Sequence, residues 1–306
     1  MKTLNSKISD LTKKIAKELL KCKIGTKIPT TPELAHKFSV GFGTIDKAMT
    51  ALKEMDAIKV QPKGQMGTYL LEKNSAALWS IMDSGPIRGS IPIPNTLEFQ
   101  GLATGLKESL REKKVDCSFS IKNGATLRVN ELLNHQCDFV LLSYQAAVSV
   151  CEKHNNLKII GTFHDKSYYG DIIILTRKNA SKEVKDWRIG IDETSLDNIA
   201  FTNDLFEKNQ KVKVMYMHIP YLIADGVIDA AVWHSSQLVP TKLIETLTFC
   251  PVDYDVTEKG IDSMAGAIVV NRDHEEMFSL LTELCDIDRI LEIQNEVIAR
   301  KRIPYS

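Results

Sequence analysis

Residues 30–58 are TTPELAHKFSVGFGTIDKAMTALKEMDAI, a stretch with the spacing of two short helices joined by a tight turn. Thr30 and Glu33 fit a capping box, and Pro32 suits the first turn of a helix that runs to Phe38. After the turn SVGF, a helix from Gly43 to Met55 turns four apolar residues inward: Ile45, Ala48, Met49 and Leu52. Two helices around a four-residue turn that contains Gly predict a helix-turn-helix.

The flanking segments complete a larger unit. Before this stretch, one apolar stripe at helical spacing predicts a helix over residues 5–22 and consists of Ile8, Leu11, Ile15 and Leu19. After it, the short strands IKV and TYLL surround the turn PKGQMG, which predicts a hairpin with Lys63 and Gln65 at its tip. A hairpin directly after the second helix makes a winged helix. We therefore expect a winged-helix domain over residues 1–73 and a connector over residues 74–85.

Charge is distributed unevenly along the chain. The 306 residues carry no formal net charge, with 39 Lys and Arg against 39 Asp and Glu. Residues 1–75 hold fourteen Lys, no Arg and seven acidic residues, so their net charge is +7 and that of residues 76–306 is −7. A basic segment joined to an acidic remainder favours DNA as the partner of the first domain. A solvated lysine-rich surface is the alternative.

The first domain resembles the GntR-type winged-helix regulators over residues 5–72, through IPTTPELA (28–35), GT (43–44) and GTY (67–69). The expected DNA-binding residues are Thr30, Thr31, Gly43, Thr44, Lys47, Lys53, Lys63 and Gln65. In that family arginines commonly contact DNA at the positions of Pro32, Phe42 and Asp46. Without them, the domain is expected to hold DNA through backbone, hydroxyl and lysine contacts. It either reads an unusual site, such as an A/T-rich one, or binds weakly. A relic fold and a protein-binding role are the alternatives.

The rest of the chain repeats the order strand, loop, helix. Strands such as IRGSIPIP, CDFVLLSY and AAVWHSS alternate with helices, which predicts parallel sheets with sites at the strand carboxyl ends. This order resembles the type 2 periplasmic-binding-protein fold and implies two lobes with crossings near Thr176 and Ser263. The expected fold class is α/β: an N-terminal winged helix and a C-terminal two-lobed, periplasmic-binding-protein-like effector domain over residues 86–306. Lobe 1 takes about 86–176 and 263–306, and lobe 2 about 177–262. The combination is similar to the YhfZ-type family.

The strand ends supply candidates for an interlobe cleft. Hydroxyls and backbone amides at helix starts favour an anionic group, so we expect a small anionic effector. Trp233 is expected to stack on a flat or apolar part of it. The candidates are Asn95, Thr96, Asn123, Gly124, Thr126, Ser143, Tyr144, Glu193, Thr194, Ser195, Trp233, His234 and Ser235. Helix caps and turns are the alternative role for such residues.

Catalytic and metal motifs are not found in the sequence. It contains no GxGxxG, Walker, HExxH or GxSxG pattern, so we expect no enzyme, no cofactor and no metal. His164 and Asp165 are the best acid–base candidates, and a loop role is the alternative. Six well-separated Cys fit reduced thiols, and the charged start and short apolar runs favour a cytoplasmic protein.

These observations favour a ligand-responsive transcription regulator that binds operator DNA as a homodimer. Two-fold dimers meet half-sites about one helical turn apart. The dimer surface is expected on the first helix or on the terminal helices around residues 287–298, whose apolar stripe is otherwise core. Two alternatives remain: an enzyme that uses the interlobe cleft, with His164 or His234 as its base, and an adaptor that does not bind DNA.

Overall fold

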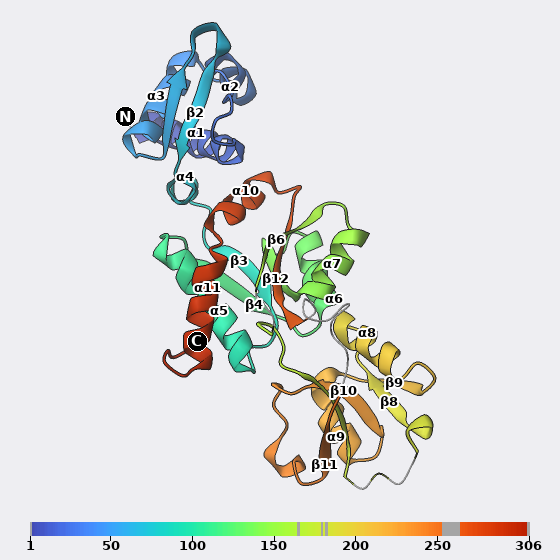
Figure 1. Ribbon diagram of the computed structural model, residues 1–306. Helices are drawn as coiled ribbons and strands as arrows, with labels where there is room; N and C mark the ends of the chain where they lie inside the picture. Colours follow the sequence, from blue (N-terminus) through green and yellow to red (C-terminus); the bar gives the residue numbers. More distant parts are fainter. Residues whose placement is uncertain (1, 164–165, 179, 181–182, 253–263, 305–306) are drawn as a thin grey trace. The chain divides into compact units, whose positions relative to one another are not determined.

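The computed structural model describes residues 2–163, 166–178, 180, 183–252 and 264–304 (Figure 1). The chain forms two compact units. The first comprises Met1–Ile87, Ser109–Cys117 and Arg272–Asp286, and the second comprises Arg88–Glu108, Ser118–Asn271 and Ile287–Ser306. Ser263 and the pair His164–Asp165, which carried sequence-based expectations, lie outside the described residues.

The first unit begins with a winged helix, as predicted. Its elements are α1 (Lys2–Lys21), α2 (Thr31–Phe38), α3 (Phe42–Glu54), β1 (Ile58–Pro62), the 3-10 turn η1 (Gly64–Met66) and β2 (Thr68–Lys73). The capping box is present, because Thr30 N–H donates to Glu33 Oε2 at 2.7 Å and Thr30 Oγ1 accepts from Glu33 N–H. Ile15 and Leu19 of α1 and Ile45 and Leu52 of α3 are fully buried and form the centre of this core.

The winged helix packs on two further helices of the same unit, α4 (Ser75–Met82) and α10 (Glu275–Leu284). The residue that ends the wing, Lys73, lies at this junction with its side chain fully buried. Its Nζ is 2.6 Å from Glu283 Oε1 of α10 and donates to the carbonyls of Leu20 and Cys22, each at 2.9 Å. A buried ammonium needs such partners to offset its lost hydration. The connection therefore anchors the winged helix to the helix that follows the last strand of lobe 1.

Lobe 1 is a five-stranded sheet in the order β4-β3-β5-β12-β6. Its strands are β3 (Ile87–Ile91), β4 (Cys117–Ile121), β5 (Phe139–Ser143), β6 (Leu157–Thr162) and β12 (Gly266–Asn271). Its helices are α5 (Leu97–Glu112), α6 (Ala125–Leu133), α7 (Tyr144–Lys153) and α11 (Ile287–Ile298), with α5 and α11 on one face and α6 and α7 on the other (Figure 1). The apolar stripe of α11 is core, because Ile290, Ile293 and Val297 are buried.

Lobe 2 is a second five-stranded sheet in the order β11-β7-β10-β8-β9. Its elements are β7 (Ile172–Arg177), η2 (Val184–Asp186), β8 (Arg188–Ile191), α8 (Leu196–Leu205), β9 (Gln210–Lys213), η3 (Tyr216–His218), α9 (Ile219–Ala224), β10 (Ala230–His234), η4 (Thr241–Leu243) and β11 (Leu247–Pro251). The crossing expected near Thr176 is wrong, because β7 belongs to this sheet. The chain passes from lobe 1 to lobe 2 between Thr162 and Ile172. The apolar run DIIIL (residues 171–175) indicates a buried strand, but it does not indicate which of the two sheets that strand joins.

The two sheets are built alike. Read from β9, lobe 2 has the order β9-β8-β10-β7-β11, which matches the order of lobe 1 strand for strand. In lobe 1, β5 pairs parallel with β3 and antiparallel with β12. In lobe 2, β10 pairs parallel with β8 and antiparallel with β7. Both β12 and β7 are the first strand after the chain enters the lobe from the other one.

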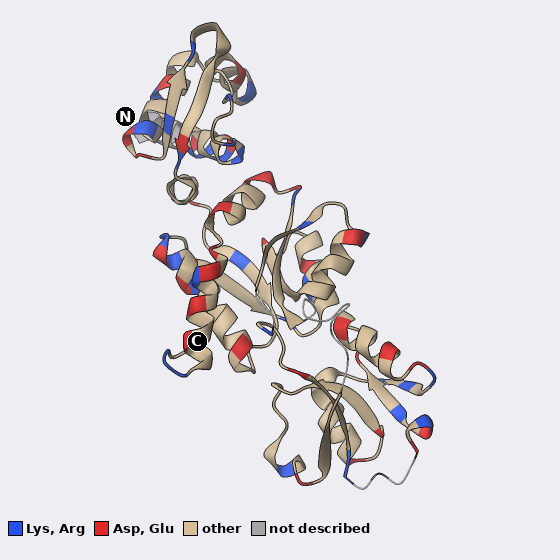
Figure 2. Cartoon of the chain, viewed as in Figure 1, with Lys and Arg blue, Asp and Glu red and all other residues tan. Residues whose placement is uncertain are grey.

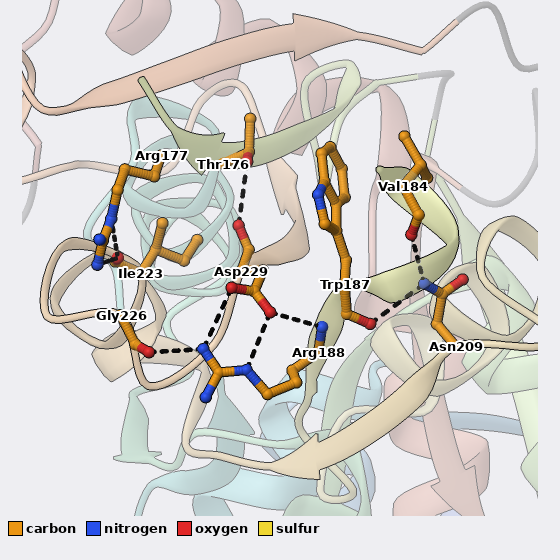
Figure 3. A network of polar contacts seen from close by, with 9 residues as sticks. All are labelled: Thr176, Arg177, Val184, Trp187, Arg188, Asn209, Ile223, Gly226 and Asp229. Carbon is orange, nitrogen blue, oxygen red and sulfur yellow. Dashed lines mark hydrogen bonds and ion pairs between the residues drawn. The ribbon is translucent and has the colours of Figure 1, made fainter. Parts of the chain in front are cut away.

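Each lobe contains an Arg–Asp ion pair at the equivalent point of its sheet. In lobe 1, Asp138 precedes β5 and accepts from Arg88 N, Nε and Nη2 at 2.8, 3.2 and 2.8 Å. In lobe 2, Asp229 precedes β10 and accepts from Arg188 N, Nε and Nη2 at 2.8, 2.9 and 3.1 Å (Figure 3). In each lobe the Asp N–H also donates to the carbonyl of the same Arg. Each pair thus ties the start of the first strand to the start of the third.

Replacing Asp138 with Ala is expected to lower the free energy of unfolding by about 1–2 kcal/mol, because three donors of Arg88 lose their acceptor. The control is Asp171→Ala, since Asp171 forms an exposed ion pair with Lys166 and should change the value by less than about 0.5 kcal/mol. Urea unfolding followed by circular dichroism measures both. Equal losses in the two variants would contradict a structural role for the Arg88 pair.

Candidate effector-binding cleft

A small cavity of about 40 Å³ lies between the two lobes of the second unit. A water molecule needs about 10–15 Å³ by this measure, so the cavity has room for only about three. The polar side chains that line it come from both lobes and from the crossing between them: Asn95, Asn123, Arg128, Tyr168, Tyr169, Asp192, Ser195, Tyr216, His234 and Gln237. The lobes are therefore closed on each other around a polar interior.

Arg128 of α6 brings a buried positive charge to the cavity. Its side chain is 3% exposed and donates from Nε to the Leu141 carbonyl at 3.1 Å and from Nη1 to the Lys122 carbonyl at 2.8 Å. Nη2 donates to the Tyr168 hydroxyl at 2.9 Å. Within the described part of the chain, no carboxylate lies within ion-pair distance of Arg128. A guanidinium has five N–H donors, so some stay available to a ligand.

Asp197 of lobe 2 connects the two lobes through a hydrogen bond. It lies in the first turn of α8, is 3% exposed, and accepts from Ser143 Oγ of lobe 1 at 2.7 Å. Burial raises the pKa of Asp197 to about 6, although hydrogen bonds from Ser143 and Tyr169 and the charge of Arg128 act to lower it. The carboxylate thus changes its charge close to neutral pH, at a point where the two lobes touch.

His234 ends β10 and faces the same cavity. Its ring stacks on Tyr169 with 3.8 Å between centroids and 2° between planes. Burial lowers the pKa of His234 to about 3, so the imidazole is neutral at physiological pH. Its Nδ1 is buried with no hydrogen-bond partner among the described residues. This nitrogen is free to bond with a water molecule or a ligand.

Two further contacts close the cleft. Asn95 Nδ2 of lobe 1 donates to Gln237 Oε1 of lobe 2 at 2.8 Å, and Thr126 N–H donates to the Thr194 carbonyl at 3.2 Å. Gly124 has a φ of +87°, and a Cβ there would lie 2.4 Å from Thr194 Oγ1. The close approach of the lobes at this point therefore requires glycine.

The outer face of α3 is open to solvent. Its exposed residues are Phe42, Gly43, Asp46, Lys47, Thr50, Lys53 and Glu54. Lys63 and Gln65 are exposed in the wing, and the Lys63 ammonium lies 4.6 Å from the centre of the Tyr69 ring. Lysines are frequent over the winged helix in Figure 2. Near the C-terminal end of α1, Lys17 and Lys21 pair instead with Glu276 and Glu275 of α10.

Comparison with known proteins identifies the family. Residues 74–305 match the YhfZ C-terminal domain, and residues 23–70 match a helix-turn-helix domain. The chain belongs to the YhfZ family. YhfZ of Escherichia coli (strain K12) is 29% identical to it over 297 residues, which are 95% of this chain and 94% of that protein.

Solved structures agree with this assignment. The crystal structure of YhfZ from Shigella flexneri is 26% identical, with a TM-score of 0.62 over 76% of this chain and 98% of that one. The periplasmic aliphatic sulphonate binding protein SsuA from Escherichia coli has a TM-score of 0.51 at 12% identity, over 71% of this chain and 75% of that one. The predicted fold class, a winged helix joined to a periplasmic-binding-protein-like domain, is therefore confirmed.

In this member of the YhfZ family, the structure brings five of the predicted effector residues to the cavity: Asn95, Asn123, Gly124, Ser195 and His234. Ser143, Thr126 and Thr194 lie beside it in the contacts between the lobes. Thr96, Ser143 and Ser195 also accept from N–H groups of a first helical turn, as the alternative role of helix caps predicts. Glu193 pairs with Lys213, and Tyr144 and Ser235 are not among the lining residues.

The expectation for Trp233 is wrong. Its ring is 1% exposed, stacks on Tyr216 at 4.4 Å and packs with Ile219 and Ile223 of α9 in the lobe 2 core. Side chains alternate along a strand, so His234 points to the opposite side from Trp233 and reaches the cavity.

Several lining residues were not predicted. Arg128 lies in the middle of α6, and Tyr216 lies in the 3-10 turn η3. Tyr168 and Tyr169 lie in the crossing between the lobes, which was expected near Thr176. Arg128 follows Gly124 by four residues, about one helical turn, and this spacing is the signal that could have indicated it.

The predicted DNA-binding residues divide into two groups. Gly43, Lys47, Lys53, Lys63 and Gln65 are exposed. Thr44 is half-buried, Thr30 caps α2, and the Thr31 hydroxyl donates to Asp46 Oδ1 at 3.4 Å. Among the described residues, no helix is both long and apolar enough to cross a membrane, and no group of His, Cys, Asp and Glu is placed to hold a metal ion.

Replacing Asp197 with Asn should make stability less dependent on pH. The pKa of Asp197 is higher in the folded than in the unfolded chain, so its contribution is full below about pH 4 and is lost as the pH rises through about 6. The wild-type protein should lose roughly 3 kcal/mol relative to Asp197→Asn between pH 4 and pH 7.5. Urea unfolding at a series of pH values measures this difference.

The matched control is Ser143→Ala, which keeps the carboxylate but removes one of its donors. Because the Ser143 hydrogen bond lowers the pKa of Asp197, this variant should extend the loss of stability to higher pH. A difference between wild type and Asp197→Asn that stays constant with pH would refute the buried-carboxylate explanation.

Proposed function

We propose that this protein is a ligand-responsive transcription regulator. The single observation that carries the proposal is Arg128, a buried cation without a carboxylate partner among the described residues, in a cavity that both lobes enclose, in a chain that starts with a winged helix. A buried charge is costly unless it is paired. A small anionic effector would supply that pairing. The unpartnered Asn95 Oδ1 would accept from a donor group of the effector, and His234 Nδ1 is a further polar contact.

The winged helix is proposed to bind operator DNA in the manner of the GntR-type regulators it resembles. Support comes from the net charge of +7 over residues 1–75 and from the exposed outer face of α3. We also propose that the DNA-binding form is a cytoplasmic homodimer, because two copies of the helix-turn-helix would read two half-sites.

Effector and DNA binding are proposed to be coupled through α10. This helix follows β12, a central strand of the lobe 1 sheet, and it holds the end of the wing through the Glu283–Lys73 pair. A change in lobe 1 that accompanies opening of the cleft would move α10 and, with it, the winged helix. Such coupling is reciprocal, so DNA would change the affinity for the effector by the same factor.

We propose that the cleft binds its effector without converting it. The alternative is an enzyme, and one observation favours it: Asp197 and His234, both with strongly shifted pKa values, contact Tyr169 in one closed cleft. Incubation with a bound ligand followed by mass spectrometry separates the two functions. Recovery of the unchanged ligand supports a sensor, and a product that disappears in Asp197→Asn supports an enzyme.

At least one small anion should stabilise the protein against heat. Short carboxylates, alkanesulfonates and phosphate esters are to be compared with their neutral amides and alcohols in thermal unfolding of the full chain. A ligand at about 100 times its Kd adds about 2.7 kcal/mol of stability. Arg128→Gln should remove this effect, whereas Arg177→Gln, an Arg that donates to the Ile223 and Ala224 carbonyls, should keep it. Stabilisation by neutral ligands alone would contradict the anionic effector.

The double variant Lys47→Glu/Lys63→Glu should bind DNA more weakly. Each lysine that contacts a phosphate adds about 0.9 to the slope of log K against log salt, so the slope should fall by about 2. Fluorescence anisotropy with a duplex from the region upstream of the protein's own gene, at several salt concentrations, measures it. The control Lys185→Glu, at an exposed site of lobe 2, should leave the slope unchanged. An unchanged slope in the double variant would argue against this DNA-binding face.

A further inference from the structure

An exposed apolar side chain lies at the N-terminal end of α3, the end at which a recognition helix contacts the bases of DNA. Phe42 is the first residue of α3, and its side chain is 59% exposed. The N-terminal residues of a recognition helix are those that contact base edges in the major groove. Burying a Phe side chain contributes about 1.5–3 kcal/mol, so a partner that covers Phe42 would gain free energy from this contact.

The surroundings of Phe42 leave room for such a partner. Gly41 and Gly43 flank it, and a Cβ added to either would have no atom within 4 Å. The polar residues on the outer face of α3 are balanced in charge, since Lys47 and Lys53 stand against Asp46 and Glu54. Attraction to phosphate by charge alone therefore does not explain what this face recognises.

Asp46, one turn after Phe42, has a contact of its own. Its Oδ1 accepts from the Thr31 hydroxyl of α2 at 3.4 Å, so the carboxylate joins the two helices of the helix-turn-helix. With Asp46 engaged in this way, Phe42 is the large exposed side chain at the start of α3. Its chemistry matches one feature of the major groove, the C5-methyl group of thymine, which Phe can contact.

We infer that Phe42 determines specificity by packing on thymine methyl groups, and that the operator carries thymine opposite the start of α3. The inference rests on the proposed DNA-binding function of the winged helix. It assigns base reading to an apolar contact, while the lysines of α3 and the wing hold the phosphates. Affinity then depends on salt through Lys47 and Lys63, and sequence preference depends on Phe42.

Deoxyuridine provides the test, because it pairs like thymidine but lacks the methyl group. A binding duplex is first selected from a random-sequence pool with the full-length protein. Each thymidine is then replaced singly by deoxyuridine, and Kd is measured by fluorescence anisotropy at fixed salt. At one or two positions the wild-type protein should bind the deoxyuridine duplex about four-fold more weakly, the factor expected for one buried methyl group.

The variant Phe42→Ala should bind the thymidine duplex about as weakly as the wild type binds the deoxyuridine duplex. For this variant, the ratio of the Kd values for the two duplexes should be near one. Phe42→Leu, which stays apolar, should keep part of the ratio. The matched control is Met55→Ala at the other end of α3, where the side chain is 55% exposed, and it should keep the full ratio. Thermal unfolding should be unchanged in all three variants, because both sites are exposed.

The outcomes separate this inference from the proposed function. If a sequence is selected but no thymidine responds to the substitution, or if Phe42→Ala keeps the wild-type ratio, Phe42 does not read the methyl group. If the selection enriches no sequence, the regulator proposal itself is overturned, and the inference with it. A loss of binding by Phe42→Ala that is equal on both duplexes and on random DNA would also refute it, since that result indicates a general contact.

Discussion

Two equivalent Arg–Asp pairs join the strands that lead to the cleft of the periplasmic-binding-protein-like domain. Each pair locks the start of the first strand of a lobe to the start of the third, and these strands lead to the residues of the cleft. Ser143 ends β5 and His234 ends β10, so the register of these strands sets where Ser143 meets Asp197 of lobe 2 and where His234 reaches the cavity. Because the same contact occurs in both lobes, the two lobes place equivalent strands at the cleft. The side chains that these strands carry toward the cleft differ.

Those side chains differ in their electrostatics. Lobe 1 contributes a permanently charged guanidinium held by two backbone carbonyls, whereas lobe 2 contributes a carboxylate and a neutral imidazole. Each is buried, and burial strengthens any interaction with a charged ligand. The contact between the lobes thus holds a cation, a carboxylate and a neutral imidazole around a cavity of about 40 Å³.

The parts of the structure that local interactions decide could be predicted from the sequence. The capping box at Thr30, the hairpin of the wing and the alternation of strands with helices depend on neighbours in sequence, and each was predicted. The prediction of parallel sheets is only partly right, because β7 and β12 pair antiparallel with their neighbours. The cleft was predicted in part, because residues after strand ends are easy to locate. Arg128, Tyr169 and the sheet that receives β7 depend on the meeting of segments far apart in the chain. Trp233 was misplaced by a single step of strand alternation, which periodicity alone does not resolve.

The buried Lys73 limits how freely this winged helix can be exchanged for another. Its ammonium is enclosed by the carbonyls of Leu20 and Cys22, at the end of α1, and by Glu283, a residue more than two hundred positions later in the chain. A fragment that stops at the end of the wing would keep the cation and lose its counter-ion. Replacing the winged helix with a foreign one would remove the Lys73 partner of Glu283, which is 39% exposed and also accepts from Ser75 Oγ. The Lys73–Glu283 pair therefore makes the end of the wing depend on α10, a helix far away in the sequence.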